Sequence, residues 1–332
     1  MISRRTLMTA LGAALPWCAM QASLAQAAGK TWRLGYLGVG ERPTAERPDA
    51  NVEAFLRGMR DLGYVEGRNL LIEWRFAQGR YERLPALAAE LVQARVDLLV
   101  TYGTAAAQAL HGATGSIPIV IAAAIDPVGS GFAASFARPG GNMTGLSAMA
   151  VDLSQKHLEL LSSMAPRLPH VAVLVNPGNA SHPAIVRQVQ IAAKILNIRM
   201  SSVQASTADD IERAFASARR DGAGAVIVAG DALFAGVGPQ IAAAAMKHRL
   251  PSIGIYRDHV GAGALMSYGQ DIAAFHRRAA TYVDKIFKGT RAGDLPIEQP
   301  MTIELFINGK TAKALGLTIS HSLLISAEKV IE

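Results

Sequence analysis

Two kinds of segment alternate along the chain. Short runs of apolar residues, typical of buried strands, are followed by longer stretches in which apolar residues recur every three or four positions, as on one face of a helix. In the first half this pattern predicts strands at 32–37, 69–74, 96–101 and 117–125, and helices at 49–62, 81–94 and 104–111. Strands that alternate with helices in this way build a parallel sheet covered on both faces.

After residue 147 the pattern begins again, without obvious sequence identity to the first half. It predicts strands at 171–176, 199–203, 225–229 and 252–255, and helices at 154–165, 183–196, 208–221 and 239–248. The remaining chain adds a strand at 264–267, a long helix at 272–287, a strand at 301–307 and a helix at 310–315. A chain that crosses three times between two lobes, near residues 145–149, 265–269 and 298–303, fits this order.

The predicted fold class is therefore α/β, with two doubly wound parallel-sheet lobes joined by three hinge crossings. Lobe 1 is expected to hold residues 28–147 and 268–299, and lobe 2 residues 148–267 and 300–332. Several crossings make a hinge with a cleft between the lobes, a layout typical of proteins that close around a ligand.

The first 27 residues have the pattern of a secretory signal peptide. Arg4 and Arg5 precede an apolar stretch at 7–20, and Ala25-Gln26-Ala27 resembles a cleavage site. The paired arginines also resemble a twin-arginine signal, so both the general and the twin-arginine export routes stay open. The apolar stretch is too short to span a membrane. We expect a periplasmic protein.

The composition narrows the function further. Of 332 residues, 50% are hydrophobic and 18% charged, which suits a large buried core. The net charge of +7 is scattered among acidic neighbours, which favours a solvated surface over a nucleic-acid partner. Cys18, the only cysteine, lies in the predicted signal peptide, so no disulfide is expected. The eight histidines lack metal-ligand spacing, and no nucleophile elbow or dinucleotide motif occurs. The sequence predicts no metal, no cofactor and no catalytic residue.

Glycines and polar residues stand where predicted strands end, and the carboxyl ends of parallel strands face the ligand crevice of an open sheet. Gly103 and Thr104 follow one strand and open a helix, where free N–H groups attract a carboxylate. Asp126 and Asp231 each follow an apolar strand, where a carboxylate suits a ligand ammonium or hydroxyl group. The alternative at all these positions is an ordinary cap or turn without a ligand.

Four more residues fit the same rule. Asn176 and Asn179 lie in the corresponding loop of the second half, where either side chain can reach the cleft. Tyr268 lies at a predicted crossing, where it stacks on a ligand ring or packs the hinge. Gly38 ends the first strand, in a loop that can touch a ligand.

Five segments together resemble the ABC transporter substrate-binding family whose best-known members bind tryptophan or tyrosine. They read FLRGMRDLGYVEGRNLLIEWRFAQG, PALAAELVQARVDLLVTYGTAAAQAL, IPIVIAAAIDPVGSGFAASFARPGGNMTGLS, GALMSYGQD and IEQPMTIELFINGKTAKALGLTIS. The resemblance runs from about Trp32 to Glu332. It implies a type I periplasmic binding fold and delivery of the ligand to a membrane permease driven by an ATPase. By position it implies ligand contacts at Gly38, Gly103, Thr104, Asp126, Asn176, Asp231 and Tyr268.

The expected function is that of a monomeric, extracytoplasmic substrate-binding protein of an ABC importer, with an ABC permease as partner. It would trap a small carboxylate, such as an aromatic amino acid, by hinge closure and without chemistry. The loops at 41–48 and 229–236 can change which ligand is bound, so the identity of the ligand stays open. A sensing module for a membrane receptor is the main alternative, and a secreted α/β enzyme is a third. We also expect Asp231→Ala to weaken an amine-bearing ligand while leaving the melting temperature of the ligand-free protein nearly unchanged.

Overall fold

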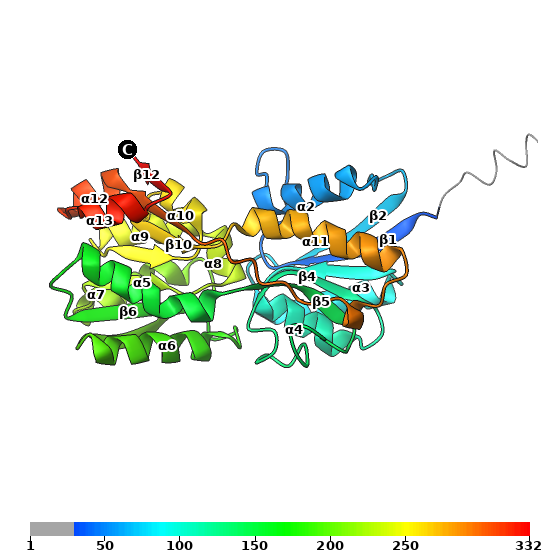
Figure 1. The fold of residues 1–332 in the computed structure, drawn as a ribbon, viewed down its shortest axis with the longest axis horizontal. Coiled ribbons are helices and arrows are strands. Elements are labelled where there is room, and N and C mark those ends of the chain that lie inside the picture. The colour runs from blue at the N-terminus through cyan, green and yellow to red at the C-terminus, as the bar shows by residue number, and fades with distance from the viewer. Residues whose placement is uncertain (1–29) are drawn as a thin grey trace, which may run out of the picture.

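Two α/β lobes lie side by side along the long axis of the molecule (Figure 1). The computed structural model describes residues 30–332. The predicted signal peptide and Cys18 therefore lie outside the described residues. Within residues 30–332, no helix is long and apolar enough to cross a membrane.

Lobe 1 is built on a parallel five-stranded sheet in the order β2-β1-β3-β4-β5. Its strands are β1 (Trp32–Gly38), β2 (Leu70–Phe76), β3 (Leu98–Thr101), β4 (Ile119–Ile125) and β5 (Met143–Ala148). Its helices are α2 (Ala50–Asp61), α3 (Leu84–Gln93), α4 (Thr104–Ala113) and α11 (Ile272–Phe287), with a short 3₁₀ turn η1 (Tyr81–Arg83). Every residue of β3, β4 and β5 is buried, as expected for strands covered on both faces.

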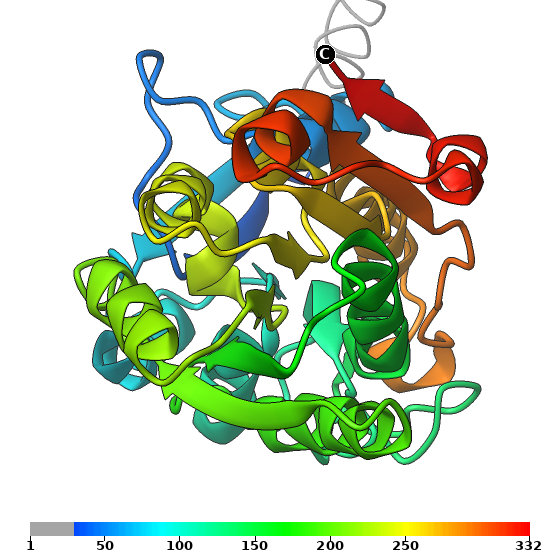
Figure 2. The same cartoon turned by 90° about the vertical axis from the view of Figure 1, so that its left-hand side faces the viewer.

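Lobe 2 contains a seven-stranded sheet in the order β12-β11-β10-β9-β8-β6-β7. Its strands are β6 (His170–Val175), β7 (Arg199–Gln204), β8 (Ala225–Val228), β9 (Ser252–Gly254), β10 (Met266–Gly269), β11 (Glu304–Asn308) and β12 (Lys329–Ile331). Its helices are α5 (Ala150–Met164), α6 (His182–Ile195), α7 (Asp210–Arg220), α8 (Ala232–Gly236), α9 (Gly238–Lys247), α10 (Arg257–Gly261), α12 (Gly309–Leu315) and α13 (His321–Ser326). Figure 2 views this lobe end-on, with helices on both faces of the twisted sheet.

The predicted α/β class with two wound sheets is confirmed, with one exception to the parallel order. β11 runs antiparallel to β10. The chain leaves β10 at the end that faces lobe 1, passes through α11 of lobe 1 and returns at that same end. A strand that begins where its neighbour ends must run in the opposite direction.

Three crossings join the lobes: β5 to α5, β10 to α11, and a last one from the 3₁₀ turn η2 (Ala292–Asp294) to β11. The buried side chain of Gln270 touches all three. Its Oε1 accepts the N–H of Met149 at 2.8 Å, and its amide donates to the carbonyl of Pro300. Tyr268 pairs in β10 within the lobe 2 sheet, whereas the predicted limits place residue 268 in lobe 1.

The second crossing carries α11 back to lobe 1, where it packs on α2. Gly58 of α2 makes this close approach possible. A Cβ atom at residue 58 would lie 2.7 Å from the carbonyl oxygen of Arg277 and 2.8 Å from Cβ of Ala280. We expect Gly58→Ala to lower the free energy of unfolding by about 1–3 kcal/mol, because one helix must move.

Gly112→Ala in α4 is the matched control for Gly58→Ala. A Cβ atom there meets nothing within 4 Å, so the same exchange should raise stability by up to ~1 kcal/mol through helix propensity. Urea unfolding of both variants measures the difference. Equal stabilisation by the two substitutions would contradict the close packing of α2 on α11.

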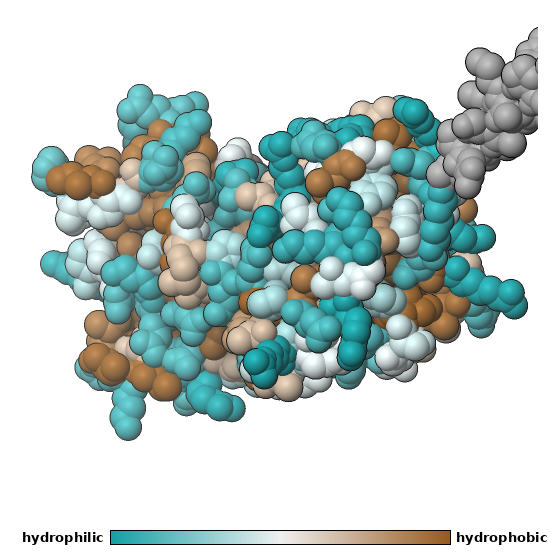
Figure 3. Space-filling model, turned by 45° about the vertical axis from the view of Figure 1, so that its right-hand side comes forward, coloured by the Kyte–Doolittle hydropathy of each residue, from teal (hydrophilic) through white to brown (hydrophobic). Residues whose placement is uncertain are grey.

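The outer surface shows no large uniform apolar area on the face drawn in Figure 3. Apolar side chains there stand in separate groups among polar ones, as is usual for the surface of a folded domain. The contact between the lobes is different, because there the apolar core continues from one lobe to the other.

Candidate functional site

The carboxyl ends of the two sheets face each other, and a small cavity of about 10 Å³ lies between them. A cavity of this size holds roughly one water molecule. Both lobes and the crossings contribute to its lining, which consists of Tyr102, Gly103, Thr104, Ala123, Ile125, Ala148, Asn179, Asp231, Ala232, Ile255, Tyr256 and Ile272. The candidate site is therefore the contact between the lobes.

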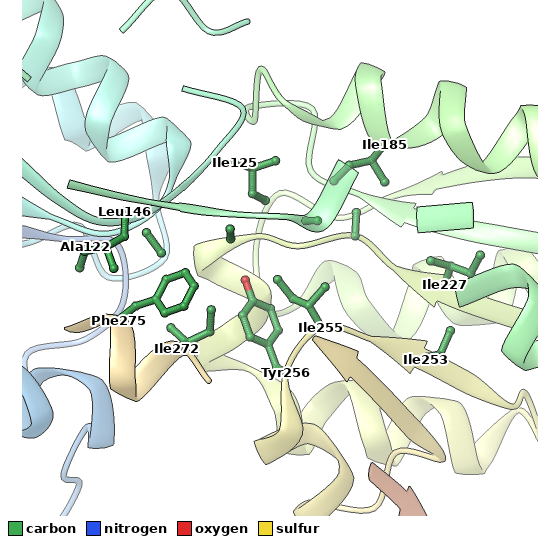
Figure 4. Packing of buried hydrophobic residues seen from close by; sticks show 14 of the residues in the cluster. Ala122, Ile125, Leu146, Ile185, Ile227, Ile253, Ile255, Tyr256, Ile272 and Phe275 are labelled. Atoms are coloured by element: carbon green, nitrogen blue, oxygen red, sulfur yellow. The ribbon is translucent and has the colours of Figure 1, made fainter. Parts of the chain in front are cut away.

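The lobes touch closely around this cavity. Gly103, with φ of +86°, comes so near to lobe 2 that a Cβ atom on it would lie 2.7 Å from Cβ of Ala232. On the apolar side, Ile125 and Ile272 lie opposite Ile255 and Tyr256 (Figure 4). The structure thus describes a closed arrangement of the lobes.

Among residues 30–332, Asp231 is the only acidic side chain that lines the cavity, and it is 1% exposed. It is the N-cap of α8, where its Oδ1 accepts the N–H of Leu233 at 2.9 Å. The same oxygen accepts the hydroxyl of Tyr81 from lobe 1 at 2.8 Å. Oδ2 accepts the amide of Asn179 at 2.7 Å. The carboxylate is therefore a structural cap and, at the same time, a contact between the lobes.

Neutral groups surround the charge of Asp231. Among the residues that the structure describes, no Lys or Arg forms an ion pair with it, and the nearest basic nitrogen is Nε2 of His182, 3.7 Å from Oδ2. Nδ1 of His182 accepts the N–H of Asn176, so the ring proton sits on Nε2. Burial lowers the pKa of His182, and the ring is neutral at pH 7. A buried carboxylate held only by neutral donors favours a cationic partner.

Three tyrosines converge on Asp231 from both lobes. Tyr102 of lobe 1 donates to the hydroxyl of Tyr256 at 3.1 Å, and Tyr256 donates to the backbone carbonyl of Asp231 at 2.9 Å. Tyr81 reaches the carboxylate itself. Burial raises the pKa of each of these three hydroxyls, so all remain neutral donors at ordinary pH. These hydrogen bonds link the lobes in the closed arrangement.

The structure brings five of the predicted residues together. Gly103, Thr104, Asn179 and Asp231 line the cavity, and the amide of Asn176 lies 3.5 Å from Oδ1 of Asp231. The predicted capping role of Thr104 is wrong, because Gly103 is the N-cap of α4. The Thr104 hydroxyl instead donates to the carbonyl of Ile125 and accepts its N–H, which ties α4 to the end of β4.

The other three predicted residues lie outside the lining of this cavity. Gly38 packs against the ring of Phe76 at the end of β1. Asp126, with φ of +49°, accepts the N–H of Gly129 at 2.8 Å and so orders a turn. The backbone carbonyl of Tyr268 accepts Nε2 of His157 at 2.7 Å, beside the hinge. Ligand contacts from these three residues stay predictions.

Sequence reasoning missed the three tyrosines, although the same rule applies to them. Tyr102 follows β3 directly, and Tyr256 comes two residues after β9. Tyr81 lies in the turn that follows β2. Each stands beyond the carboxyl end of a strand, where ligand-facing residues are expected. Among residues 30–332, no group of three or more His, Cys, Asp or Glu side chains could hold a metal ion.

The family model described as ABC transporter substrate binding protein matches residues 45–331. The chain belongs to this family. A tyrosine-binding protein of Clostridioides difficile (strain R20291) is 28% identical over 284 residues, which cover 84% of this chain and 81% of the relative. The resemblance drawn from the sequence is thereby confirmed, and the family consists of binding proteins.

Solved structures support the fold. A conserved domain protein of Vibrio cholerae has a TM-score of 0.82 at 29% identity, covering 91% of this chain and 100% of the other. An ABC domain from Streptococcus pneumonia in complex with L-Trp scores 0.81 at 23% identity, with the same coverage. A ligand-free, open substrate-binding protein of Clostridium difficile with adhesive properties scores 0.59 at 25% identity, over 90% of this chain and 99% of its own. The fold is the type I periplasmic binding fold.

Proposed function

We propose that this chain is the extracytoplasmic substrate-binding protein of an ABC importer and that it traps an amino acid between its lobes. One juxtaposition carries the proposal. The buried carboxylate of Asp231 and the N-terminus of α4 line the same cavity from opposite lobes. The ammonium group of an amino acid can bind Asp231, and its carboxylate group can bind the N-terminus of α4.

The N-terminus of α4 suits a carboxylate because no side chain caps it. Gly103 has no side chain, and the hydroxyl of Thr104 is engaged with Ile125. The first N–H groups of a helix have no partner within the helix, and they carry the positive end of its dipole. Anions therefore bind well at such a position.

The closed arrangement leaves no room for an amino acid in the 10 Å³ cavity, so the ligand must enter a more open form. Ligand binding then shifts the equilibrium towards whichever arrangement lets both lobes touch the ligand. The three crossings, tied together by Gln270, give the lobes a common hinge for this motion.

The relatives favour an aromatic amino acid. One is described as binding tyrosine, and a structure of the same fold was solved with L-Trp. Delivery to a permease follows from the family and is a separate part of the proposal. In proteoliposomes that hold the cognate permease and ATPase, the liganded protein should stimulate ATP hydrolysis, whereas a sensing role predicts no stimulation.

Thermal unfolding in the presence of each amino acid and of aromatic organic acids tests the ligand class. A ligand present at 100 times its Kd should stabilise the protein by roughly 2.7 kcal/mol. We expect tyrosine, tryptophan or a similar amino acid with an uncharged side chain to raise the melting temperature most. If amino acids and organic acids all fail with protein verified to be ligand-free, the proposed ligand class is wrong.

A further inference from the structure

A second cavity of about 520 Å³ opens beside the first, as a groove between helices α3 and α4. Lobe 2 contributes its near end through the loop that precedes α6. In the part of the chain that the structure describes, no charged residue belongs to the lining, which consists of Tyr81, Leu84, Pro85, Ala89, Thr104, Ala105, Gln108, Ala109, Gly112, Ala113, Gly178 and Ala180. We call this cavity the α3–α4 groove.

The α3–α4 groove and the small cavity are neighbours. Thr104 lines both. Tyr81 lines the groove, and its hydroxyl bonds to Asp231, which lines the small cavity. The ring of Tyr81 also packs against Gly178, where a Cβ atom would lie 3.0 Å from Cδ2 of the ring. The side chain of Tyr81 therefore stands between the groove and the buried carboxylate.

We propose that the ammonium group of the ligand takes the place of the Tyr81 hydroxyl on Asp231, and that the ligand's side chain lies in the α3–α4 groove. This inference rests on the proposed function, binding of an amino acid between the lobes. It adds the compartment that holds the side chain and the group that the ligand displaces.

The size and chemistry of the groove define the class of side chain. Its volume falls within the range of small-molecule sites. A charged side chain would lose water there without meeting an opposite charge, which is costly. The apolar lining suits an aromatic or aliphatic side chain, and the amide of Gln108 is available to a phenol or indole group. We therefore expect glutamate and lysine to bind more weakly than tryptophan or tyrosine.

The exchange at Asp231 is favourable because a cation replaces a neutral donor. Burial, and after it the charge of Asp231, raises the pKa of Tyr81, so its hydroxyl stays neutral. Hydrogen bonds in which both partners are charged are shorter and stronger than those of a neutral hydroxyl. The Tyr81 hydroxyl thus satisfies the carboxylate until the ligand arrives and then leaves it, while the ring of Tyr81 remains part of the groove lining.

The groove is tested with Ala109→Leu, which fills it from α4, and with Ala86→Leu, an exposed position of α3 outside the lining, as the matched control. Calorimetric titrations use L-tryptophan, L-tyrosine and L-alanine. We expect Ala109→Leu to weaken the aromatic ligands at least about tenfold and to leave L-alanine within about twofold of wild type. The control variant should bind all three as the wild type does.

Tyr81→Phe tests the displaced group independently. The substitution keeps the ring and removes the hydroxyl that competes with the ligand, so L-tryptophan should bind about tenfold more tightly. Unchanged or weaker binding would overturn the displacement. If Ala109→Leu leaves the affinity for the aromatic ligands unchanged, the side chain does not lie in the α3–α4 groove. The same conclusion follows if the affinity for L-alanine falls as much as that for the aromatic ligands. If the wild type binds no amino acid at all, the proposed function itself fails. That outcome is distinct from the two above, because both of those compare a variant with a wild type that binds.

Discussion

Asp231→Asn is expected to weaken the binding of an amine-bearing ligand at least about 100-fold, because it removes the only negative charge that lines the cavity between the lobes. The amide keeps the size of the carboxylate and one acceptor for the N–H of Leu233. Titration calorimetry with L-tryptophan gives the change. An analogue with the same ring and carboxylate but no amine, such as indole-3-propionate, is the matched control and should lose little affinity. Equal affinity of both proteins for L-tryptophan would remove Asp231 from the site.

The choice of asparagine corrects an expectation drawn from the sequence. Asp231→Ala was expected to leave the melting temperature of the ligand-free protein nearly unchanged. In the structure the carboxylate caps α8 and accepts Tyr81 and Asn179, so truncation leaves several buried donors without a partner. We now expect Asp231→Ala to cost about 2–4 kcal/mol of stability. A fall in the affinity of Asp231→Ala for ligand would therefore combine the loss of a ligand contact with the loss of folding stability.

Ala232→Phe is expected to prevent closure of the lobes and thereby to weaken the binding of L-tryptophan at least about 100-fold. Ala232 lies where the lobes approach closely, with its Cβ 2.7 Å from where a Cβ atom of Gly103 would be. A phenyl ring cannot fit there while the lobes touch, but it has space when they separate. Each lobe should therefore fold as before. Small-angle scattering should report a larger radius of gyration than for the wild type with ligand.

Ala243→Phe is the control for this substitution, since it adds the same ring at an exposed position of α9. It should bind ligand and close normally. Wild-type affinity of Ala232→Phe would contradict the proposal that both lobes close on the ligand.

The order of strands and helices was predictable because each strand–helix unit has its own apolar period. The direction of β11 was not, because it depends on which end of the sheet the third crossing enters. Local pattern carries no information about that choice. The lobe limits near Tyr268 failed for a related reason: β10 continues for two residues beyond the predicted strand end at residue 267.

The candidate site was predictable in part from the rule that strand ends face the crevice. That rule singled out Gly103, Thr104, Asn176 and Asp231, which lie together. It also singled out Asp126, whose carboxylate is used by a turn, because a turn and a ligand site call for the same residue types. The α3–α4 groove could not be predicted from the sequence, since its shape depends on how lobe 2 packs against lobe 1.

The most direct test of the account is the distance between the lobes with and without ligand. Cys18 is the only cysteine in the sequence, so after Cys18→Ser, cysteines introduced at the exposed positions Ala86 of lobe 1 and Arg187 of lobe 2 can carry spin labels. Pulsed electron paramagnetic resonance then measures their separation. We expect the amino acid that stabilises the protein most to convert a broad distribution of distances into a single, shorter distance. An unchanged distribution at a ligand concentration that saturates binding would contradict it.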